Sequence, residues 1–224
     1  MANPAQKPPP STLPRKVQLP KQSNAGQVVE LYLQVTPDGV SSTAMDGAET
    51  SYKPVGLIPS NVKGGNPVTT TTPGYEFSTE GKGPGARKTV TKLLGQAQIR
   101  VVVKIQTTYG QKAKASDRSA YGRGTTPEDE EKGETSLGFH ESCHRDNFTR
   151  FLENENFPVF AGRPGMTVEQ YHKEEQTFTD AVQAFFTRME KQSTESTDNV
   201  GYTQAEFSAK GQRTQPKDAG ADGK

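Results

Sequence analysis

Two segments of the chain, residues 28–35 and 99–109, alternate apolar and polar residues with a period of two. Such alternation is typical of a β-strand that buries one of its faces. Three shorter segments, 52–58, 75–78 and 89–94, also have strand character, and they are separated by glycine and proline clusters that favour turns. The pattern predicts that the N-terminal half of the fold, residues 27–109, is an antiparallel β-sheet with long loops.

The spacing of apolar residues changes after a glycine-rich, charged connection at residues 110–133, in which Thr126-Pro127-Glu128 predicts a short helical turn. Apolar residues three and four positions apart then predict a helix over 136–153 and a second helix over 167–192. Thr167 and Gln170 have the spacing of a capping box, which marks the start of the second helix. The sequence therefore predicts an α+β fold whose C-terminal half, residues 136–192, is a helical hairpin.

Composition distinguishes both ends of the chain from the part that is expected to fold. Residues 1–26 contain Pro8-Pro9-Pro10 and several basic residues without an acidic one, which indicates an extended, disordered arm. Such an arm is either a plain solvated terminus or a segment that docks on a secretion or delivery machine. Residues 206–224 have very few apolar side chains and are expected to form a second disordered tail. One domain over residues 27–205 is thus predicted.

The charge balance and the absence of long apolar runs narrow the classes of partner. The 27 basic and 26 acidic residues leave a formal net charge of +1, which gives no electrostatic reason to expect nucleic acid as a partner. No apolar run approaches the roughly 20 residues of a membrane span, and no Sec signal is recognisable. We expect synthesis in the cytoplasm, no membrane anchor, and export, if it occurs, through a system that needs no signal peptide.

The segment His140-Glu141-Ser142-Cys143-His144 has the pattern HExxH and lies within the first predicted helix. Residues four apart project from one face of a helix, so both imidazoles can bind one Zn²⁺ ion. Glu141 then lies beside the metal, where it can act as general base toward water that the metal acidifies. Cys143 points to another face and is interpreted as a packing residue. Two ordinary helix histidines, with no metal, are the alternative.

A catalytic zinc ion needs a third protein ligand, and Glu175 is the predicted one. It occupies an apolar seam of the second helix, where a carboxylate is costly unless it is paired or binds metal. A hairpin midpoint near residue 160 also places Glu175 level with the motif. A surface ion pair of Glu175 is the alternative, and His172 is a second candidate for a ligand or for a donor to the transition state. Should neither residue bind, residues 198–202 are the next place to look.

The HESCH segment on a helix, followed by a helix with an acidic residue, resembles the zincin metallopeptidases that have a glutamate as third ligand. The resemblance covers residues 136–192. More loosely, the β-rich half and the Thr197-Asp198-Asn199-Val200-Gly201 segment are similar to uncharacterised bacterial proteins predicted to be secreted zinc-dependent proteases. In this chain Tyr202 stands near that end where those proteins have a histidine, so Tyr202 joins His172 as an alternative ligand or donor.

The resemblance implies an enzyme that hydrolyses peptide bonds with one zinc ion and acts on a protein or peptide. It also implies that the substrate pairs with an edge strand of the sheet, and this role is expected for the strand that contains Ile99, Val101, Val103 and Ile105. Two alternatives differ from this hypothesis. One is a non-catalytic binding or assembly module, and the other is a toxin-like protease effector that a secretion system delivers.

Overall fold

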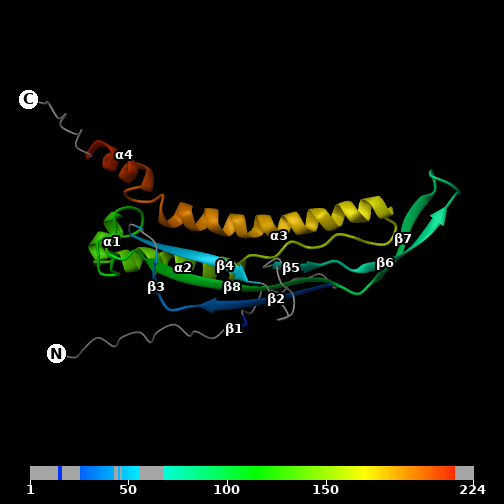
Figure 1. Ribbon diagram of the computed structural model, residues 1–224, viewed down its shortest axis with the longest axis horizontal. Coiled ribbons are helices and arrows are strands. Elements are labelled where there is room, and N and C mark those ends of the chain that lie inside the picture. Colours follow the sequence, from blue (N-terminus) through cyan, green and yellow to red (C-terminus); the bar gives the residue numbers. More distant parts are fainter. Residues whose placement is uncertain (1–14, 17–25, 43–44, 46, 56–67, 215–224) are drawn as a thin grey trace, which may run out of the picture. The chain divides into compact units, whose positions relative to one another are not determined.

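The computed structural model describes residues 15–16, 26–42, 45, 47–55 and 68–214, and their course is drawn in Figure 1. This part of the chain contains strands and four helices, so the coarse prediction of a mixed fold is confirmed. The strands are β1 (Arg15–Lys16), β2 (Gln27–Val35), β3 (Gly39–Val40), β4 (Ala48–Val55), β5 (Val68–Thr71), β6 (Gly74–Glu80), β7 (Arg87–Leu94) and β8 (Ala97–Tyr109). The helices are α1 (Pro127–Lys132), α2 (Leu137–Asn154), α3 (Val168–Thr197) and α4 (Gln204–Thr214).

Strand β8 organises the larger sheet. It runs parallel to β2 over nine residue pairs, from Gln27 opposite Ala97 to Val35 opposite Ile105. On the side away from β2 it pairs with β5 in antiparallel direction, and it also pairs with β4. The predicted antiparallel sheet is therefore wrong for the longest pairing. A period of two reports which side chains are buried and carries no information on strand direction, and the long connection from β2 to β8 permits a parallel crossover.

The other strand pairings are shorter. Strand β1 is antiparallel to β2, and β3 is parallel to the last two residues of β8. Strands β6 and β7 form a separate antiparallel sheet of two strands, with an irregularity in register between Glu76 and Phe77. Of the short candidate segments, 75–78 and 89–94 belong to β6 and β7, and residues 52–55 belong to β4, while residues 56–58 lie outside the described residues. These strands do not form one continuous antiparallel sheet.

The chain divides into two compact units, each assembled from three separate segments. Unit 1 contains residues 1–38, 51–107 and 148–190, and unit 2 contains residues 39–50, 108–147 and 191–224. Because the segments alternate along the chain, no single point in the sequence separates the units. This division differs from the β-rich and helical halves that the sequence indicated.

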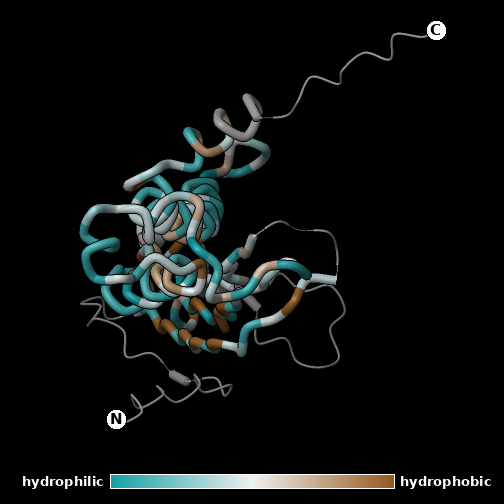
Figure 2. The backbone as a smooth tube through the Cα atoms, turned by 90° about the vertical axis from the view of Figure 1, so that its left-hand side faces the viewer, coloured by the Kyte–Doolittle hydropathy of each residue, from teal (hydrophilic) through white to brown (hydrophobic). Residues whose placement is uncertain are grey.

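Unit 1 contains the apolar core. Alternate residues of β2 and β8 are buried, and aromatic residues of α2, α3 and the segment between them pack against these strands. The hydropathy colouring follows this alternation along the strands (Figure 2). Such burial is the main favourable term in folding, at about 25 cal/mol per Å² of apolar surface. Core members are Leu31, Leu33, Ile99, Val101, Val103, Ile105, Phe148, Phe151, Leu152, Phe157, Phe178, Val182, Phe185, Phe186 and Met189.

The connection between α2 and α3 runs along α3 instead of turning back at once. Phe157 stacks on Phe185 with ring centroids 4.2 Å apart, and three residues later Phe160 lies 5.5 Å from Phe178. Extended chain advances about 3.3 Å per residue, whereas a helix rises 1.5 Å per residue. A short connection therefore covers a long stretch of α3, and opposite residues of α2 and α3 cannot be found by counting from a midpoint.

Helix α4 replaces part of the tail that was predicted to be disordered. Thr203 and Glu206 form a capping box, in which the Thr203 N–H donates to Glu206 Oε2 at 2.9 Å and the Glu206 N–H donates to Thr203 Oγ1 at 3.3 Å. The prediction of disorder is wrong for residues 206–214, because this capping box starts a helix and its Phe207 packs against Tyr121 with ring centroids 5.8 Å apart. Residues 215–224 lie outside the described part of the chain.

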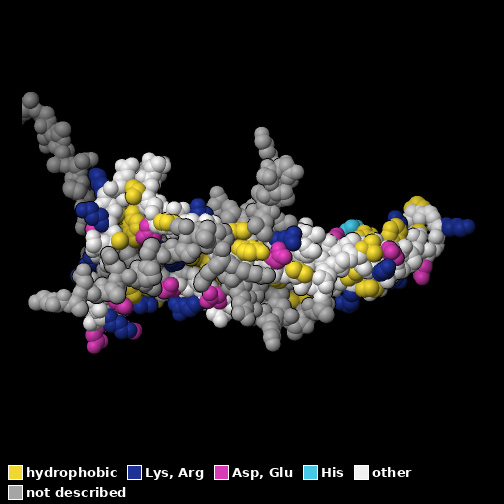
Figure 3. Space-filling model, turned by 90° about the horizontal axis from the view of Figure 1, so that it is seen from below, with side chains coloured by type: hydrophobic (Ala, Val, Ile, Leu, Met, Phe, Trp, Pro, Cys, Tyr) yellow, Lys and Arg dark blue, Asp and Glu magenta, His cyan; other side chains and the backbone are white. Residues whose placement is uncertain are grey.

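Most of the predicted N-terminal arm, residues 1–14 and 17–25, also lies outside the described residues, but Arg15 and Lys16 form β1. None of the described helices combines the length and apolar character that crossing a bilayer requires. On the face drawn in Figure 3, acidic and basic side chains are interspersed, as the near-neutral net charge leads one to expect.

Candidate metal centre

The two histidines of the HESCH segment lie one turn apart on the part of α2 that belongs to unit 2. Their rings are 5.1 Å apart, and the Nε2 atoms of both point at the same carboxylate oxygen. Asp198 Oδ1 lies 3.2 Å from His140 Nε2 and 3.0 Å from His144 Nε2. Asp198 directly follows the last residue of α3, so the end of this helix delivers the third member of the cluster.

These three side chains could hold a metal ion. Their ligand atoms all lie within 4.8 Å of one another. His140 is only 2% exposed, and the side chains of His144 and Asp198 are 12% and 13% exposed. Two imidazole nitrogens and one carboxylate oxygen form a set that transition-metal ions such as Zn²⁺ prefer.

The outer nitrogens of both rings are held by hydrogen bonds. His140 Nδ1 lies 3.0 Å from the carbonyl oxygen of Arg123, and His144 Nδ1 lies 2.8 Å from Ser193 Oγ. Because a carbonyl only accepts, the proton of a neutral His140 must sit on Nδ1, which leaves the lone pair of Nε2 directed at Asp198. His140 Nε2 and Asp198 Oδ1 are then two acceptors 3.2 Å apart, and they repel each other unless a proton or a metal ion lies between them.

The electrostatics of the cluster favour a cation. Burial alone would raise the pKa of the Asp198 carboxyl, but its hydrogen bonds to His140 and His144 outweigh burial and lower that pKa to about 2. Burial by itself lowers the pKa of His140, yet the hydrogen bonds to Asp198 and to the Arg123 carbonyl, with the charge of Glu141, raise it on balance. Asp198 is therefore ionised at neutral pH.

Glu141 lies in the same unit with its side chain almost fully covered. It is 2% exposed, and its Oε2 has no hydrogen-bonding partner among the residues that the structure describes. Its backbone carbonyl accepts a hydrogen bond from Thr50 Oγ1 at 3.2 Å, which ties this turn of α2 to the start of β4. A buried carboxylate oxygen without a partner is costly, so it is a group that a water molecule, a substrate or a cation would satisfy.

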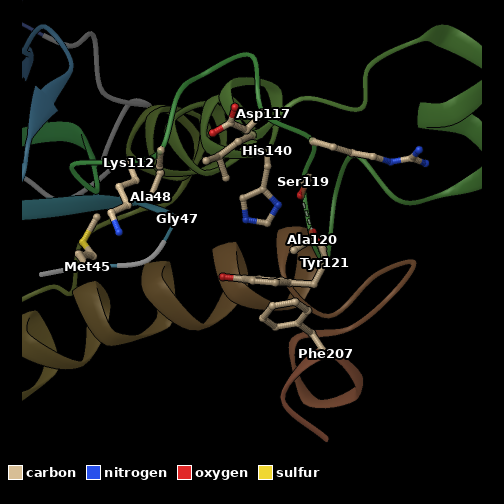
Figure 4. Close-up of a pocket in the computed structure, with 13 residues that line it drawn as sticks. Met45, Gly47, Ala48, Lys112, Asp117, Ser119, Ala120, Tyr121, His140 and Phe207 are labelled. Atoms are coloured by element: carbon tan, nitrogen blue, oxygen red, sulfur yellow. Dashed lines mark hydrogen bonds between the residues drawn. The ribbon is translucent and has the colours of Figure 1, made fainter. Parts of the chain in front are cut away.

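Tyr121 connects the cluster to a cavity of about 330 Å³ in unit 2. Its ring lies between those of His140 and Phe207, at centroid distances of 5.3 and 5.8 Å (Figure 4). Burial raises the pKa of the Tyr121 hydroxyl, and the charges of Asp198 and Glu141 raise it further, so the hydroxyl remains a hydrogen-bond donor. His140 and Tyr121 both line the cavity, so it gives access to the cluster from one side.

Glu175, the predicted third ligand, lies elsewhere. In unit 1 its carboxylate accepts a hydrogen bond from Thr72 Oγ1 at 2.6 Å and pairs with His172 Nδ1 at 2.8 Å. It precedes Ser193, the partner of His144 in unit 2, by 18 residues of α3. The hairpin midpoint near residue 160, which places Glu175 level with the motif, is wrong because the extended connection shifts the register of the two helices.

The two alternative residues also have other partners. The ring of His172 is 57% exposed, with Nε2 lying 3.0 Å from the Tyr75 hydroxyl, and it belongs to unit 1. The Tyr202 hydroxyl donates to the carbonyl of Glu206 in α4. Neither side chain is part of the His140, His144 and Asp198 cluster. Burial raises the pKa of the Cys143 thiol to about 11, which agrees with a packing role for that residue.

Strand β8 is not an edge strand, so its predicted pairing with a substrate is wrong. Ile99 and Val101 pair with β2 on one side and with β5 on the other. Val103 and Ile105 pair with β2, and β4 also joins β8. Hydrogen-bonding groups that are already used within the sheet cannot accept a further strand.

No family model, curated protein or solved structure matches this chain. The site is therefore defined by its own geometry. The sequence indicates Asp198 only as part of residues 198–202, the next place to look for a ligand, and it does not indicate Ser193 or Arg123. Ser193 and Arg123 carry no recognisable pattern, because their contacts with the histidines arise only from packing.

Proposed function

We propose that this chain is a zinc-dependent hydrolase of peptide bonds, with His140, His144 and Asp198 as metal ligands and Glu141 as general base. One observation carries the proposal. Three ligand atoms converge in unit 2, and the carboxylate oxygen Oε2 of Glu141, next to the first ligand in the chain, is buried without a partner among the described residues. A metal site needs several ligand atoms that meet at one point, and a general base needs an oxygen that can accept the proton of water.

The two nitrogen atoms and one oxygen atom of the cluster suit zinc better than they suit calcium or magnesium. Calcium and magnesium prefer sets made only of oxygen ligands, whereas two imidazoles and one carboxylate are the three ligands of several catalytic zinc sites. The Nδ1 contacts with the Arg123 carbonyl and Ser193 are the outer contacts that orient metal-binding histidines. Three protein ligands also leave the fourth position of a tetrahedral site open for water or substrate.

The side chains divide the chemistry among them. When bound, zinc supplies acidity to water and polarises the carbonyl group of the substrate. Glu141 accepts the proton of the attacking water at Oε2 and passes it to the nitrogen of the leaving amine as the peptide C–N bond breaks. The Tyr121 hydroxyl, at the cavity beside His140, can donate a hydrogen bond to the oxygen that gains charge.

A peptide is proposed as substrate because of the motif. HESCH on a helix resembles the zincin motif, and Tyr121 and Phe207 give the adjoining cavity aromatic walls that can hold an apolar side chain. Export by a secretion system and action as a toxin-like effector remain hypotheses about where such an activity would be used.

A metal site that only stabilises unit 2 is the second candidate. It is favoured by the burial of His140 and by the dense hydrogen bonding around the cluster, which are typical of structural metal sites. The two candidates make the same prediction for metal content and opposite predictions for activity.

The deciding experiment combines metal analysis with hydrolysis of a quenched fluorescent peptide library. The purified chain should bind one zinc ion, and Glu141→Gln should keep the metal while hydrolysis falls by about 10²–10⁴-fold, because the water is no longer deprotonated. Glu134→Gln, a change at an exposed glutamate of the same unit, is the control and should behave as the parent. Zinc without any hydrolysis would favour the structural candidate, and an absence of bound metal would exclude both.

A further inference from the structure

A short loop, residues 122–126, contacts both elements that carry the candidate ligands. The carbonyl oxygen of Arg123 accepts from His140 Nδ1 at 3.0 Å, and the N–H of the same residue donates to the Thr197 carbonyl at 2.7 Å. Arg123 thus contacts both His140 in α2 and Thr197, the last residue of α3, which directly precedes Asp198.

The loop approaches the cluster most closely at Gly122. A Cβ atom placed there would lie 2.2 Å from the Thr197 carbonyl oxygen, 2.8 Å from His140 Cε1 and 3.0 Å from Asp198 Cα. Gly122 also has a φ of +67°, a left-handed conformation that other residues rarely adopt. Any larger residue at this position would push against both ligand-bearing elements.

Asp129 in α1 holds this loop in place. It is fully buried, and its carboxylate accepts from Arg123 Nε and Nη2, the latter at 2.6 Å, and from the Gly124 N–H at 2.7 Å. The Arg123 guanidinium also lies over the ring of Phe139, 5.3 Å from its centroid. Both the side chain of Arg123 and the backbone after it are therefore fixed to one carboxylate.

We propose that the 122–126 loop and Asp129 form a clamp that orients His140 and Asp198 before any metal binds, with Arg123 and Asp129 as positioning residues. This inference rests on the proposed function, because it requires that the cluster holds a metal ion. The physical reason is pre-organisation. A histidine whose outer nitrogen is fixed in one tautomer and one orientation loses little freedom on binding, and loss of such outer contacts typically weakens metal affinity by about 10–100-fold.

Two matched pairs of variants test the clamp. Gly122→Ala is compared with Gly133→Ala, since both glycines are left-handed, at φ of +67° and +71°, but a Cβ at Gly133 meets nothing within 4 Å. Asp129→Asn is compared with Glu130→Gln, a change in the same helix that alters only an exposed ion pair with Arg118. Zinc affinity is measured by competition with a chelator. The visible spectrum of the cobalt-substituted protein reports ligand geometry, which a merely structural residue would not change.

We expect Gly122→Ala and Asp129→Asn to bind zinc at least about tenfold more weakly than the parent and to change the cobalt spectrum. The two controls should stay within about twofold of the parent. Equal affinities in all five proteins would overturn the clamp and leave the proposed function intact, whereas a parent chain that binds no metal would overturn both.

Folding is checked by circular dichroism of the metal-free proteins. If Gly122→Ala and Asp129→Asn do not fold, Arg123→Gln is the milder test, because it keeps the backbone groups that contact His140 and Thr197 and removes only the contacts of the guanidinium. A folded Arg123→Gln with weakened zinc binding supports the clamp. If this variant also loses its metal-free fold, or if it folds and binds zinc as the parent does, the assignment of a positioning role is wrong.

Discussion

Units 1 and 2 bury different kinds of side chain. Among the described residues, every buried hydrophobic residue except Tyr109 belongs to unit 1, while the buried polar and charged residues belong to unit 2 except for Thr36 and Thr107. Unit 1 is stabilised by close-packed apolar surface, which is non-directional and tolerant of small shifts. Unit 2 depends on directional hydrogen bonds, each of which is costly if it is left unmade. The candidate site lies entirely in the unit that gains least from apolar burial.

The largest expected loss of stability comes from opening the core of unit 1. Phe185 is fully buried and contacts the rings of Phe151, Phe157 and Phe186, so Phe185→Ala should lower the free energy of unfolding by about 3–5 kcal/mol. Urea unfolding measures this change. Phe77→Ala, at a position that is 49% exposed, is the control and should change stability by about 0.5 kcal/mol or less. Similar losses in both would show that the aromatic cluster is not a core.

The second prediction contrasts an acidic residue of α3, Glu175, with Asp198, the acidic residue that directly follows this helix. Asp198→Ala in unit 2 should weaken zinc binding by more than about a hundredfold, because it removes a ligand. Glu175→Ala in unit 1 should leave zinc affinity unchanged, since Thr72 and His172 are its partners. Chelator competition measures both. A loss of affinity in Glu175→Ala alone would restore Glu175 as the third ligand.

Metal removal should affect the two units unequally. Zinc at 1,000 times its dissociation constant stabilises a folded site by about 4 kcal/mol. Hydrogen exchange with and without a chelator should show slower exchange with zinc in residues 122–126 and 191–197, while β8 between Ile99 and Ile105 exchanges at the same rate in both states. A uniform change along the whole chain would indicate that the units open together.

The smallest effect is a pH dependence in unit 2. The hydrogen bonds from Arg123 hold the pKa of Asp129 well below its usual value, despite its burial. A carboxyl with a depressed folded pKa stabilises the fold above its unfolded pKa, about 3.9, and loses this contribution as pH falls toward its folded pKa. The melting temperature of Asp129→Asn should therefore fall less between pH 5 and pH 3 than that of the parent. Glu130→Gln is the control. If the melting temperatures of the parent and both variants fall equally between pH 5 and pH 3, Asp129 is not a source of the pH dependence.

Local features of the chain were predictable because they depend on neighbours in sequence. Thr126 caps α1, Thr167 and Gln170 form the expected capping box, and the HESCH segment lies on a helix. The spacing of four between His140 and His144 is enough to place both rings together, because a helical turn brings these positions onto one face. Helix α4 differs from the predicted tail although its start also has a local signal, the capping box of Thr203 and Glu206.

Long-range features were not predictable from these patterns. The alternation in β2 and β8 was seen, but it is the same for parallel and antiparallel pairs, so the direction of the sheet was wrong. The ion pair of the partly exposed Arg123 with the buried Asp129 joins a loop to the first turn of a helix, and no periodicity reports such a contact. Nor does any pattern distinguish a central strand from an edge strand when its neighbours lie far away in sequence.

By itself the sequence determined the two long helices, the two longest strands and that two histidines and a glutamate share one helix, because hydrogen bonds and side-chain spacing within an element set these features. Only the tertiary structure decided which carboxylate meets those histidines. The extended connection of Phe157 and Phe160 along α3 sets the register of the two helices, and this register brings Ser193 and Asp198, instead of Glu175, to His144. A few residues of extended chain cover as much distance as two or three turns of helix, so counting residues cannot replace packing.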